Sequence, residues 1–469
     1  MVLKEETNMN IDTIKSVYFI GAGGIGMSAL VRYFLSLGKA VAGYDRTASA
    51  LTERLCAEGA VIHYEDDCAL IPECCKDKEH TLVVYTPAVP CTHSELVWFS
   101  EQGFEIQKRA QVLGTITRSR RGLCAAGTHG KTTTSAMAAH LIYNSHVGAT
   151  AFLGGISQNY GTNLLLSDKS DYVVIEADEF DRSFHQLRPY MSVITSTDPD
   201  HLDIYGTPEA YWESFEHYTS LIDPEGALII HEGLEIKPRV QEGVRVLTYS
   251  RHEGDYHAGN VRIGGGEVVF DFVSPQGTVK DIRLGVPLSI NIDNGIAAMA
   301  MAQLCGVTDE ELREGMASFR GVERRFDFKL KTEAKVFLTD YAHHPAEIRQ
   351  SALSIRELYA GRKVTVIFQP HLYSRTNDFY REFAESLSLF DEVILTDIYP
   401  AREEPIPGVT SALIYDNLKE SVEKRMITKE EVLATVEAMK DNLEVLVSLG
   451  AGDIENYASQ ITDILTSAL

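Results

Sequence analysis

The sequence has no apolar run of about 18 residues free of charge, and this absence argues against a helix that spans a membrane. It is also poor in cations: 43 Lys and Arg residues against 67 Asp and Glu give a net charge of −24. Such an acidic chain is poorly suited to nucleic acid or to an anionic membrane. Residues 1–16 contain acidic side chains and lack the apolar core of a secretory signal, so we expect a cytoplasmic protein.

Paired cysteine motifs are missing as well. The seven cysteines include no C-x-x-C pair. Some of them lie near histidines in the sequence, but the spacings fit no standard zinc pattern. The residues concerned are Cys68, Cys74, Cys75 and Cys91 with His63, His80 and His93. We therefore expect free thiols, some of them buried.

Long repeats and low-complexity tracts are absent, and apolar β-branched runs alternate with helical stretches, which predicts an α/β fold. At roughly 150 residues per domain, the length suggests about three domains. We expect a Rossmann-like domain over 1–120, a P-loop ATPase-like domain over 121–325 and a second Rossmann-like domain over 326–469. Expected strands include 16–20, 40–45, 123–126, 172–175, 191–195, 336–339, 364–368, 392–396 and 444–448, with a hairpin over 261–270. Expected helices include 27–37, 297–304, 309–318, 346–358 and 379–389.

The first phosphate-binding candidate is the glycine loop Gly21–Gly26, a G-x-G-x-x-G pattern between a strand and a helix. Backbone amides and a helix N-terminus can bind a diphosphate there without a cationic side chain. Asp45 follows about 20 residues later, where an acid commonly binds a ribose hydroxyl. The pattern does not distinguish NAD from a nucleotide sugar, and a glycine turn used only for packing is the alternative.

The second candidate is the segment Gly127-Thr128-His129-Gly130-Lys131-Thr132-Thr133-Thr134, which follows a buried strand. It ends like a Walker A loop, although Ala125 stands at the first glycine position. Lys131 would contact the β- and γ-phosphates of a triphosphate, and the Thr132 hydroxyl would contact Mg²⁺. A chain with two such loops is typical of a ligase or kinase that acts on an activated sugar.

Acidic residues follow two of the expected central strands. Glu176 begins the run Glu176–Asp181, and His201 lies among the acids of Asp198–Asp203. Carboxylates at a strand end beside a P-loop can bind the Mg²⁺ of a nucleotide. His201 could bind a second cation, so that two ions hold the triphosphate and an attacking carboxylate together. A solvated acidic loop and a structural histidine are the alternatives.

Cations and histidines gather near the third domain. Arg324 and Arg325 could reach phosphate oxygens, or could form a surface ion pair. The segment Asp340–Pro345 carries paired histidines after an expected strand. Arg375 follows the next strand along the chain, in a segment with His371 and Tyr373, and its guanidinium suits a small carboxylate such as an amino acid.

Taken together, these segments resemble the Mur ligase family. The matching stretches run in order from residue 21 to about residue 454. They are GAGGIGMSAL, GTHGKTTT, FLGG followed by GTN, EADE, DHLD, RRFD, DYAHHPAEI, QPHLYSRT, DIYPARE and GAGDI. The glycine loop followed by Met27-Ser28, and the DYAHHP segment, resemble the branch that joins L-alanine to UDP-N-acetylmuramate.

The resemblance implies ATP-dependent amide formation in the cytoplasmic phase of peptidoglycan synthesis, with ATP and Mg²⁺ as cofactors. The lactyl carboxylate of UDP-N-acetylmuramate would attack the γ-phosphate of ATP, giving an acyl phosphate and ADP. The amine of L-alanine would then attack the acyl carbon and phosphate would leave.

The resemblance also assigns residues to these roles. For UDP-N-acetylmuramate, in the N-terminal domain, they are Gly23, Gly24, Ile25, Gly26 and Met27, and the spacing noted above adds Asp45 to this site. For ATP they are Gly127, Thr128, His129, Gly130, Lys131, Thr132, Thr133, Asn291, Asn294, Arg325 and Asp340. For the amino acid they are Tyr341, His343 and Arg375. For metal they are Thr132, Glu176 and His201. We expect the catalytic residues to be Lys131, Glu176, His201, His343 and Arg375.

The chain departs from the usual family pattern at several positions. Leu372 stands where an arginine is usual, and a usual histidine, serine and asparagine are replaced by Ile290, Phe180 and Ser196. Other branches use a carbamoylated lysine after the DHLD segment, but residues 202–222 contain no lysine, so we expect no carbamate.

Two other functions compete with this interpretation. A ligase that recycles a tripeptide onto UDP-N-acetylmuramate would share the motifs but would need a wider acceptor site. An NAD-dependent oxidoreductase would use Gly21–Gly26 and Asp45, but it would leave Lys131 and Glu176 without a role. A protein that only senses nucleotides is disfavoured for the same reason.

Overall fold

The structure, a computed structural model, describes residues 11–323, 326–401 and 403–468. The chain forms two compact units. The first contains the chain up to Gly259 together with Asp271–Lys280 and Asp293–Phe319. The second contains Asn260–Phe270, Asp281–Ile292 and Arg320–Leu469. The predicted α/β class is confirmed, because sheets dominated by parallel strands alternate with helices along the chain.

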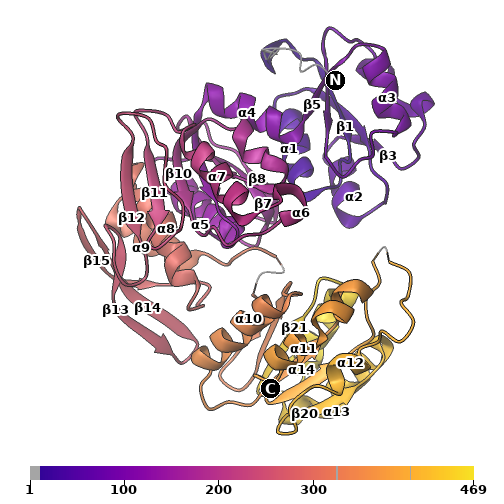
Figure 1. Cartoon of the computed structure of the whole chain (residues 1–469), viewed down its shortest axis with the longest axis vertical. Helices are drawn as coiled ribbons and strands as arrows, with labels where there is room; N and C mark the ends of the chain where they lie inside the picture. The colour runs from indigo at the N-terminus through magenta and orange to yellow at the C-terminus, as the bar shows by residue number, and fades with distance from the viewer. Residues whose placement is uncertain (1–10, 324–325, 402, 469) are drawn as a thin grey trace. The chain divides into compact units, whose positions relative to one another are not determined.

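A five-stranded parallel sheet begins the first unit, in the order β3-β2-β1-β4-β5. Its central strand β1 is buried along its whole length, as the apolar run Ser16–Ile20 predicts. The strands are β1 Ser16–Ile20, β2 Ala40–Tyr44, β3 Val61–His63, β4 Thr81–Tyr85 and β5 Glu105–Lys108, and the helices are α1 Ile25–Ser36, α2 Ala50–Ala57, α3 Ser94–Glu101 and α4 Arg109–Ser119. Helices flank the sheet on both sides (Figure 1). The carboxyl ends of these strands carry the first glycine loop.

A seven-stranded sheet forms the rest of the first unit's core, in the order β12-β11-β10-β6-β9-β7-β8. Only β8 runs antiparallel to its neighbour among the pairs that the described residues form. The strands are β6 Arg121–Ala126, β7 Thr150–Ser157, β8 Thr162–Leu165, β9 Tyr172–Glu176, β10 Pro189–Ile194, β11 Ala227–His231 and β12 Arg245–Tyr249. The helices are α5 Lys131–Asn144, α6 Leu202–Tyr205, α7 Pro208–Thr219, α8 Asn291–Leu304 and α9 Asp309–Ser318.

The two sheets of the first unit share one large apolar cluster. Helix α1 packs against β7 and β8, and Phe34 and Phe152 are both buried in the cluster. Burial of such side chains contributes roughly 2 kcal/mol each before the entropy of ordering is subtracted. The two phosphate-binding loops therefore belong to one packed body.

A three-stranded sheet, in the order β13-β14-β15, follows in the chain. It comprises β13 His257–Gly264, β14 Glu267–Ser274 and β15 Gly277–Arg283. The hairpin predicted over 261–270 corresponds to the turn between β13 and β14. Alternate residues of β14 are buried, which is the period expected when one face of a sheet packs on apolar residues.

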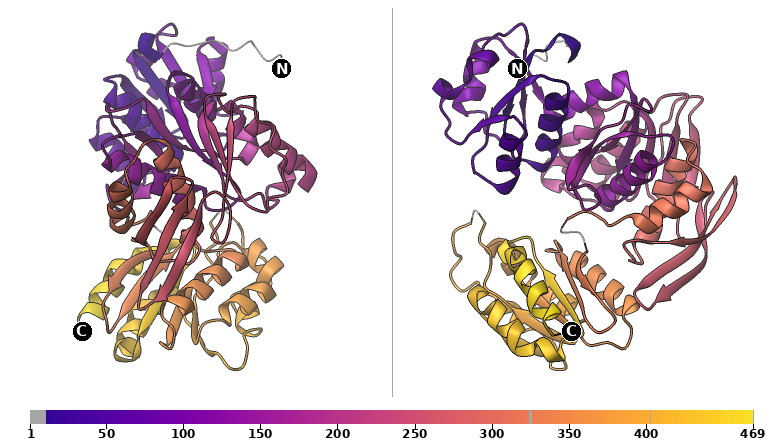
Figure 2. Two further views of the ribbon diagram at one scale, coloured as in Figure 1. Left: turned by 90° about the vertical axis from the view of Figure 1, so that its left-hand side faces the viewer. Right: turned by 180° about the vertical axis from the view of Figure 1, so that it is seen from behind.

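A six-stranded sheet dominates the second unit, in the order β16-β17-β21-β18-β19-β20. Edge strand β16 is antiparallel to β17, and the other pairs are parallel. The strands are β16 Asp327–Lys331, β17 Val336–Asp340, β18 Val364–Phe368, β19 Glu392–Leu395, β20 Glu423–Met426 and β21 Val445–Leu449. The helices are α10 Pro345–Leu358, α11 Tyr373–Leu387, α12 Ala412–Tyr415, α13 Val432–Met439 and α14 Ala458–Thr466. Figure 2 shows this sheet, in orange and yellow, with helices packed along its strands.

Two expectations from composition can be compared with the structure. All seven cysteines are free, and Cys75 and Cys124 are buried, as predicted. Within residues 11–323, 326–401 and 403–468, no helix is long and apolar enough to cross a membrane.

Candidate active site

The P-loop lies between the buried strand β6 and helix α5. Its N-cap residue, Gly130, has a φ of 82°, and no side chain among the described residues caps the helix. The first amides of α5 are therefore available to an anion, as at other helix N-termini. The segment that follows β10 holds the loop, because Ser196 Oγ accepts a hydrogen bond from His129 N at 2.8 Å. Gly127–Gly130 with Lys131, Thr132 and Thr133 therefore form a turn whose geometry suits an anion.

Lys131 folds back over this loop. Its ammonium donates to Gly127 O at 2.6 Å and to Thr128 O at 3.1 Å. It also lies 2.8 Å from Glu179 Oε2, and the Glu179 side chain is only 2% exposed. Burial raises the pKa of Glu179, and the positive charge of Lys131 offsets part of that rise. Lys131, the predicted phosphate-binding lysine, is thus held at the loop by an internal carboxylate.

Thr132 and Glu176 form the second polar pair of the site. The Thr132 hydroxyl donates to Glu176 Oε1 at 3.1 Å. The other carboxylate oxygen, Oε2, is buried and has no hydrogen-bond partner among the described residues. Gly154 of β7 leaves room for this carboxylate, because a Cβ there would overlap Glu176 Oε2 and displace it. Burial raises the pKa of Glu176, and the positive charge of Lys131 offsets part of that rise. A buried carboxylate oxygen without a partner, beside a hydroxyl, suits a hard cation.

His201 belongs to the Lys131 side of the site. Its Nε2 lies 3.9 Å from Glu179 Oε1 and 3.7 Å from Asp200 Oδ2. Its ring contacts the edge of Phe180, one of the positions that depart from the family pattern. Its backbone has a φ of 53°, which is uncommon for a residue other than glycine and is often found at functional sites. Of the three predicted metal-binding residues, Thr132 and Glu176 therefore lie together, whereas His201 lies beside Glu179.

The first glycine loop lies between β1 and α1. Asp45, directly after β2, accepts a hydrogen bond from Gly23 N at 2.6 Å, so its carboxylate holds the loop. Gly24 caps α1 through its backbone only, since no described side chain caps this helix. The uncapped first turn of α1 can therefore receive a phosphate.

A cavity of about 280 Å³ connects this glycine loop to the acidic strand end. Its lining includes Gly24 and Gly26 of the loop and the acids Glu176 and Asp178. Arg109, the first residue of α4, also lines the cavity. A ligand bound to the first loop can therefore extend toward the Thr132–Glu176 pair.

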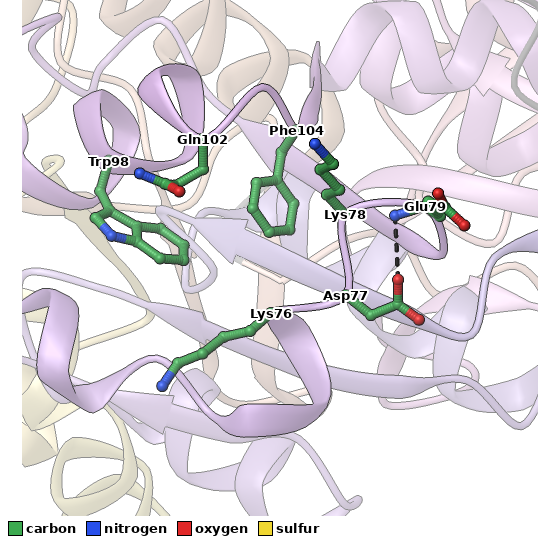
Figure 3. A pocket seen from close by; sticks show the side chains of 7 residues that line it. All are labelled: Lys76, Asp77, Lys78, Glu79, Trp98, Gln102 and Phe104. Carbon is green, nitrogen blue, oxygen red and sulfur yellow. Dashed lines mark hydrogen bonds between the residues drawn. The ribbon is translucent and has the colours of Figure 1, made fainter.

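A second cavity, of about 470 Å³, lies at the opposite edge of the five-stranded sheet, where β4 and β5 begin (Figure 3). Trp98 and Phe104 form its apolar wall, and the exposed side chains of Lys76 to Glu79 surround it. These charges balance one another. The cavity contains none of the predicted site residues.

Helix α8 carries the two predicted adenine contacts in its first turn. Asn294 lies beside the P-loop helix, because its Oδ1 accepts a hydrogen bond from Thr134 Oγ1 at 3.2 Å. Asn291 donates to Val286 O at 3.1 Å. Both side chains are buried.

The second unit contains the residues predicted for the amino acid. Asp340 ends β17, and the ring of His343 packs edge-on against the rings of Tyr341 and His371. Arg375 lies in the first turn of α11, and its Nη1 is buried without a hydrogen-bond partner among the described residues. A buried guanidinium nitrogen that lacks an acceptor suits an incoming carboxylate. The predicted phosphate contact Arg325, and its neighbour Arg324, lie outside the described residues.

Three residues of the site had no individual role assigned from the sequence. Glu179 and Asp178 belong to the acidic run after β9, but the sequence does not show that Glu179 pairs with Lys131. Arg109 belongs to no recognised motif, and only its place at a strand end could have indicated it.

Comparisons with known proteins identify the family of the chain. Sequence profiles of three domains match the chain: the Mur ligase family catalytic domain over residues 16–121, the Mur ligase middle domain over 125–302 and the Mur ligase glutamate ligase domain over 324–453. The UDP-N-acetylmuramate–L-alanine ligase of Phocaeicola vulgatus is 67% identical over 457 residues, which cover 97% of this chain and 99% of that protein. The enzyme of the same name from Parabacteroides distasonis is 61% identical over 458 residues, covering 97% and 98%.

Solved structures show the same relationship. The UDP-N-acetylmuramate–alanine ligase of Thermotoga maritima superposes with a TM-score of 0.79 at 28% identity, covering 97% of this chain and all of that chain. A murein peptide ligase of Psychrobacter arcticus has a TM-score of 0.64 at 19% identity, covering 97% and 99%, and shares the fold.

The fold and the two loops define the class of the protein: an α/β protein with a P-loop. The chain belongs to the Mur ligase family, as the predicted resemblance implies. This family is ATP-dependent.

Proposed function

We propose that the chain joins L-alanine to the lactyl carboxylate of UDP-N-acetylmuramate, with ATP as the energy source. The product is UDP-N-acetylmuramoyl-L-alanine, formed with ADP and phosphate in cytoplasmic peptidoglycan synthesis, a process that cell-wall biogenesis, cell shape and cell division require. One observation carries the proposal: the cavity lined by the first glycine loop reaches Glu176, which is hydrogen-bonded to Thr132 of the P-loop. Two relatives more than 60% identical over nearly the whole chain bear this activity in their names.

In this proposal each of the three predicted domains binds one substrate. Residues 1–120 bind the sugar nucleotide, 121–325 bind ATP, and 326–469 bind the amino acid. Substrates held on different domains must be brought together, and water must be kept from the activated acyl group.

In the first half-reaction, an oxygen of the lactyl carboxylate attacks the γ-phosphorus of ATP, and the bond to ADP breaks. A carboxylate is a poor electrophile, so this step converts its oxygen into part of a good leaving group. Lys131 and the amides of the P-loop bind the phosphates and stabilise the negative charge that moves to the leaving oxygen. To do so, Lys131 exchanges its contact with Glu179 for the nucleotide.

The Thr132–Glu176 pair fits Mg²⁺, because Glu176 Oε2 is buried and lacks a partner. Within the described ranges, no group of three or more His, Cys, Asp or Glu side chains could hold a metal alone. Mg²⁺ usually binds through one or two protein ligands together with phosphates, which agrees with a two-residue site. When bound, Mg²⁺ neutralises phosphate charge so that the carboxylate can approach. His201, beside Glu179, is the ligand we propose for a second cation.

In the second half-reaction, the amine of alanine attacks the acyl carbon, phosphate leaves, and the nitrogen gives up a proton. Arg375 binds the carboxylate of alanine through its buried Nη1. His343 Nδ1 lies 2.9 Å from Tyr341 O, and a carbonyl oxygen can only accept, so Nδ1 carries the hydrogen. Nε2 can then receive the proton from the amine.

Phosphate release from ATP and Mg²⁺ in the presence of UDP-N-acetylmuramate tests this proposal. L-Alanine, glycine, L-serine and an L-Ala-D-Glu-containing tripeptide serve as alternative acceptors. We expect the fastest release with L-alanine. Release with the tripeptide alone would instead make the chain a recycling ligase, and no release with any acceptor would refute the sugar nucleotide as substrate.

A further inference from the structure

Arg109 occupies the boundary between the two loops of the first unit. It follows β5 directly and begins α4. A Cβ added at Gly26 would lie 2.5 Å from its Nη1, so the guanidinium lies against the first glycine loop. Its Nη2 lies 3.5 Å from Asp178 Oδ2, two residues after Glu176. The side chain is 25% exposed and can therefore be reached from the cavity.

The charges around the cavity make this position unusual. Among the described residues that line it, Glu176 and Asp178 are the acids and Arg109 is the sole cation. Lys108, the neighbouring cation, does not line the cavity and pairs with Asp181 at 2.8 Å. Any anionic group that extends from the glycine loop toward Glu176 meets two carboxylates, and Arg109 supplies the compensating charge.

The contact with Asp178 is long for an ion pair with a guanidinium. Charge-assisted hydrogen bonds of this kind usually measure about 2.7–2.9 Å. The Arg109 fork therefore lies near a carboxylate without the short paired contacts that it can form. A stronger carboxylate ligand can replace Asp178 at little cost.

We propose that Arg109 binds the carboxylate of the sugar nucleotide and aims it at the site of phosphoryl transfer. This inference rests on the proposed function. The diphosphate has the amides of the glycine loop and the N-terminus of α1. The carboxylate has no such partner in the cavity and must pass between two acids. A planar guanidinium can bind it through two parallel hydrogen bonds, and Asp178 keeps the fork in place until the substrate arrives.

Binding measured by calorimetry without ATP tests the assignment on the full chain. The ligands are UDP-N-acetylmuramate, UDP-N-acetylglucosamine, which lacks the lactyl carboxylate, and UDP. We expect Arg109→Met to weaken UDP-N-acetylmuramate binding roughly 10- to 100-fold, as for a lost hydrogen bond to a charged group. Binding of the other two ligands should change less than about threefold, because the loop amides remain. Lys108→Met is the matched control and should leave all three affinities nearly unchanged.

A second variant keeps the test decisive if Arg109→Met folds poorly. Asp178→Asn removes the competing carboxylate and should tighten UDP-N-acetylmuramate binding by roughly threefold or more, with no change for UDP. Equal losses for all three ligands in Arg109→Met would show that Arg109 serves the diphosphate, and would overturn the inference. Unchanged binding, or weaker UDP-N-acetylmuramate binding by Asp178→Asn, would overturn it as well. If the wild-type chain itself does not bind UDP-N-acetylmuramate, the proposed function fails instead.

Discussion

The ammonium group of Lys131 lies 2.8 Å from the carboxylate of Glu179, a side chain that is 2% exposed. The partners stand 48 residues apart in the chain and meet because β6 and β9 are neighbours in the sheet. Removing one member of a buried pair leaves the other charge uncompensated, so this contact has consequences for nucleotide binding. Glu179 occupies the ammonium that we propose for the phosphates of ATP.

Glu179→Gln should tighten the binding of a non-hydrolysable ATP analogue. The amide cannot hold the ammonium as strongly as a carboxylate, so Lys131 is released to the phosphates. We expect a gain of roughly threefold to tenfold, about 1 kcal/mol. Titration of the analogue measures it. Glu213→Gln, at a carboxylate that is 67% exposed on α7, is the control. Weaker binding of the analogue by the Glu179 variant would contradict competition for Lys131.

Lys131→Ala should reduce turnover below about 1% of the wild-type rate, because a charge-stabilising donor is lost from the transferring phosphate. Binding of UDP-N-acetylmuramate should stay nearly unchanged, since that ligand uses the other loop. Initial rates of phosphate release and calorimetry check the two statements. Lys78→Ala, an exposed lysine of the cavity in Figure 3, should change neither. Loss of both properties in Lys131→Ala would mean that the two sites are not separate.

Much of the fold could be predicted from the sequence because buried parallel strands are continuous apolar runs. Strands β1 and β18 were predicted with their observed bounds, 16–20 and 364–368. Helices α8 and α11 begin six residues earlier than predicted, at Asn291 and Tyr373. Their first turns are polar, so apolar periodicity alone misses them. Edge strand β16 is absent from the predicted strands for the same reason, because it contains the charged residues Lys329 and Lys331.

For the site too, local features could be predicted from the sequence and contacts between distant residues could not. The residues of each loop are adjacent in sequence, and the structure forms both loops at strand ends as predicted. Contacts between segments that are distant in the chain could not be predicted from the sequence, because strand register and side-chain direction depend on the whole sheet. Glu179 forms an ion pair with Lys131, and Asp45 accepts a hydrogen bond from the amide of Gly23. Arg109 lies between Gly26 and Asp178. None of these contacts follows from spacing.

Gly154→Ala should displace Glu176, because the added methyl group would overlap Oε2. We expect the Mg²⁺ concentration for half-maximal activity to rise roughly tenfold, as when the support of a metal ligand is lost. A magnesium titration of the initial rate measures this change. Gly259→Ala in β13 is the matched control, since a Cβ there would meet Val273 Cγ2 at 3.4 Å, which its neighbour tolerates. An unchanged magnesium requirement in Gly154→Ala would exclude Glu176 as a ligand.

Arg375→Ala should raise the KM for L-alanine roughly 10- to 100-fold, because a hydrogen bond to a charged group is lost. The KM for ATP should change little, since the P-loop lies on another part of the chain. Initial rates with each substrate varied in turn separate the two constants. Arg381→Ala, on the same helix, should leave both constants close to wild type. Equal increases for alanine and ATP would remove Arg375 from the amino-acid site.

A buried polar cluster in the five-stranded domain lies apart from this chemistry. Glu95 is fully buried, accepts a hydrogen bond from Tyr18 Oη at 2.8 Å and lies 3.3 Å from His63 Nε2. Burial raises the pKa of Glu95 from 4.5 to about 7, and burial lowers the pKa of His63. His93, also buried nearby, has its pKa lowered by burial. Burial therefore shifts the pKa values of all three groups in the direction that favours the neutral form.

Glu95→Gln should separate the glutamate's contribution to stability from that of the histidines. Between pH 4.5 and about 7 the folded protein keeps the Glu95 proton while the unfolded chain releases it, so wild-type stability falls as pH rises through this range. The variant lacks this loss but keeps the histidine contributions, which act in the opposite direction. Relative to wild type, its free energy of unfolding should rise by on the order of 3 kcal/mol between these limits and stay level above pH 7. Urea unfolding at several pH values measures the difference. Glu101→Gln, at the exposed end of the same helix, should show no such trend, and a difference independent of pH in Glu95→Gln would mean that Glu95 is already ionised in the folded protein.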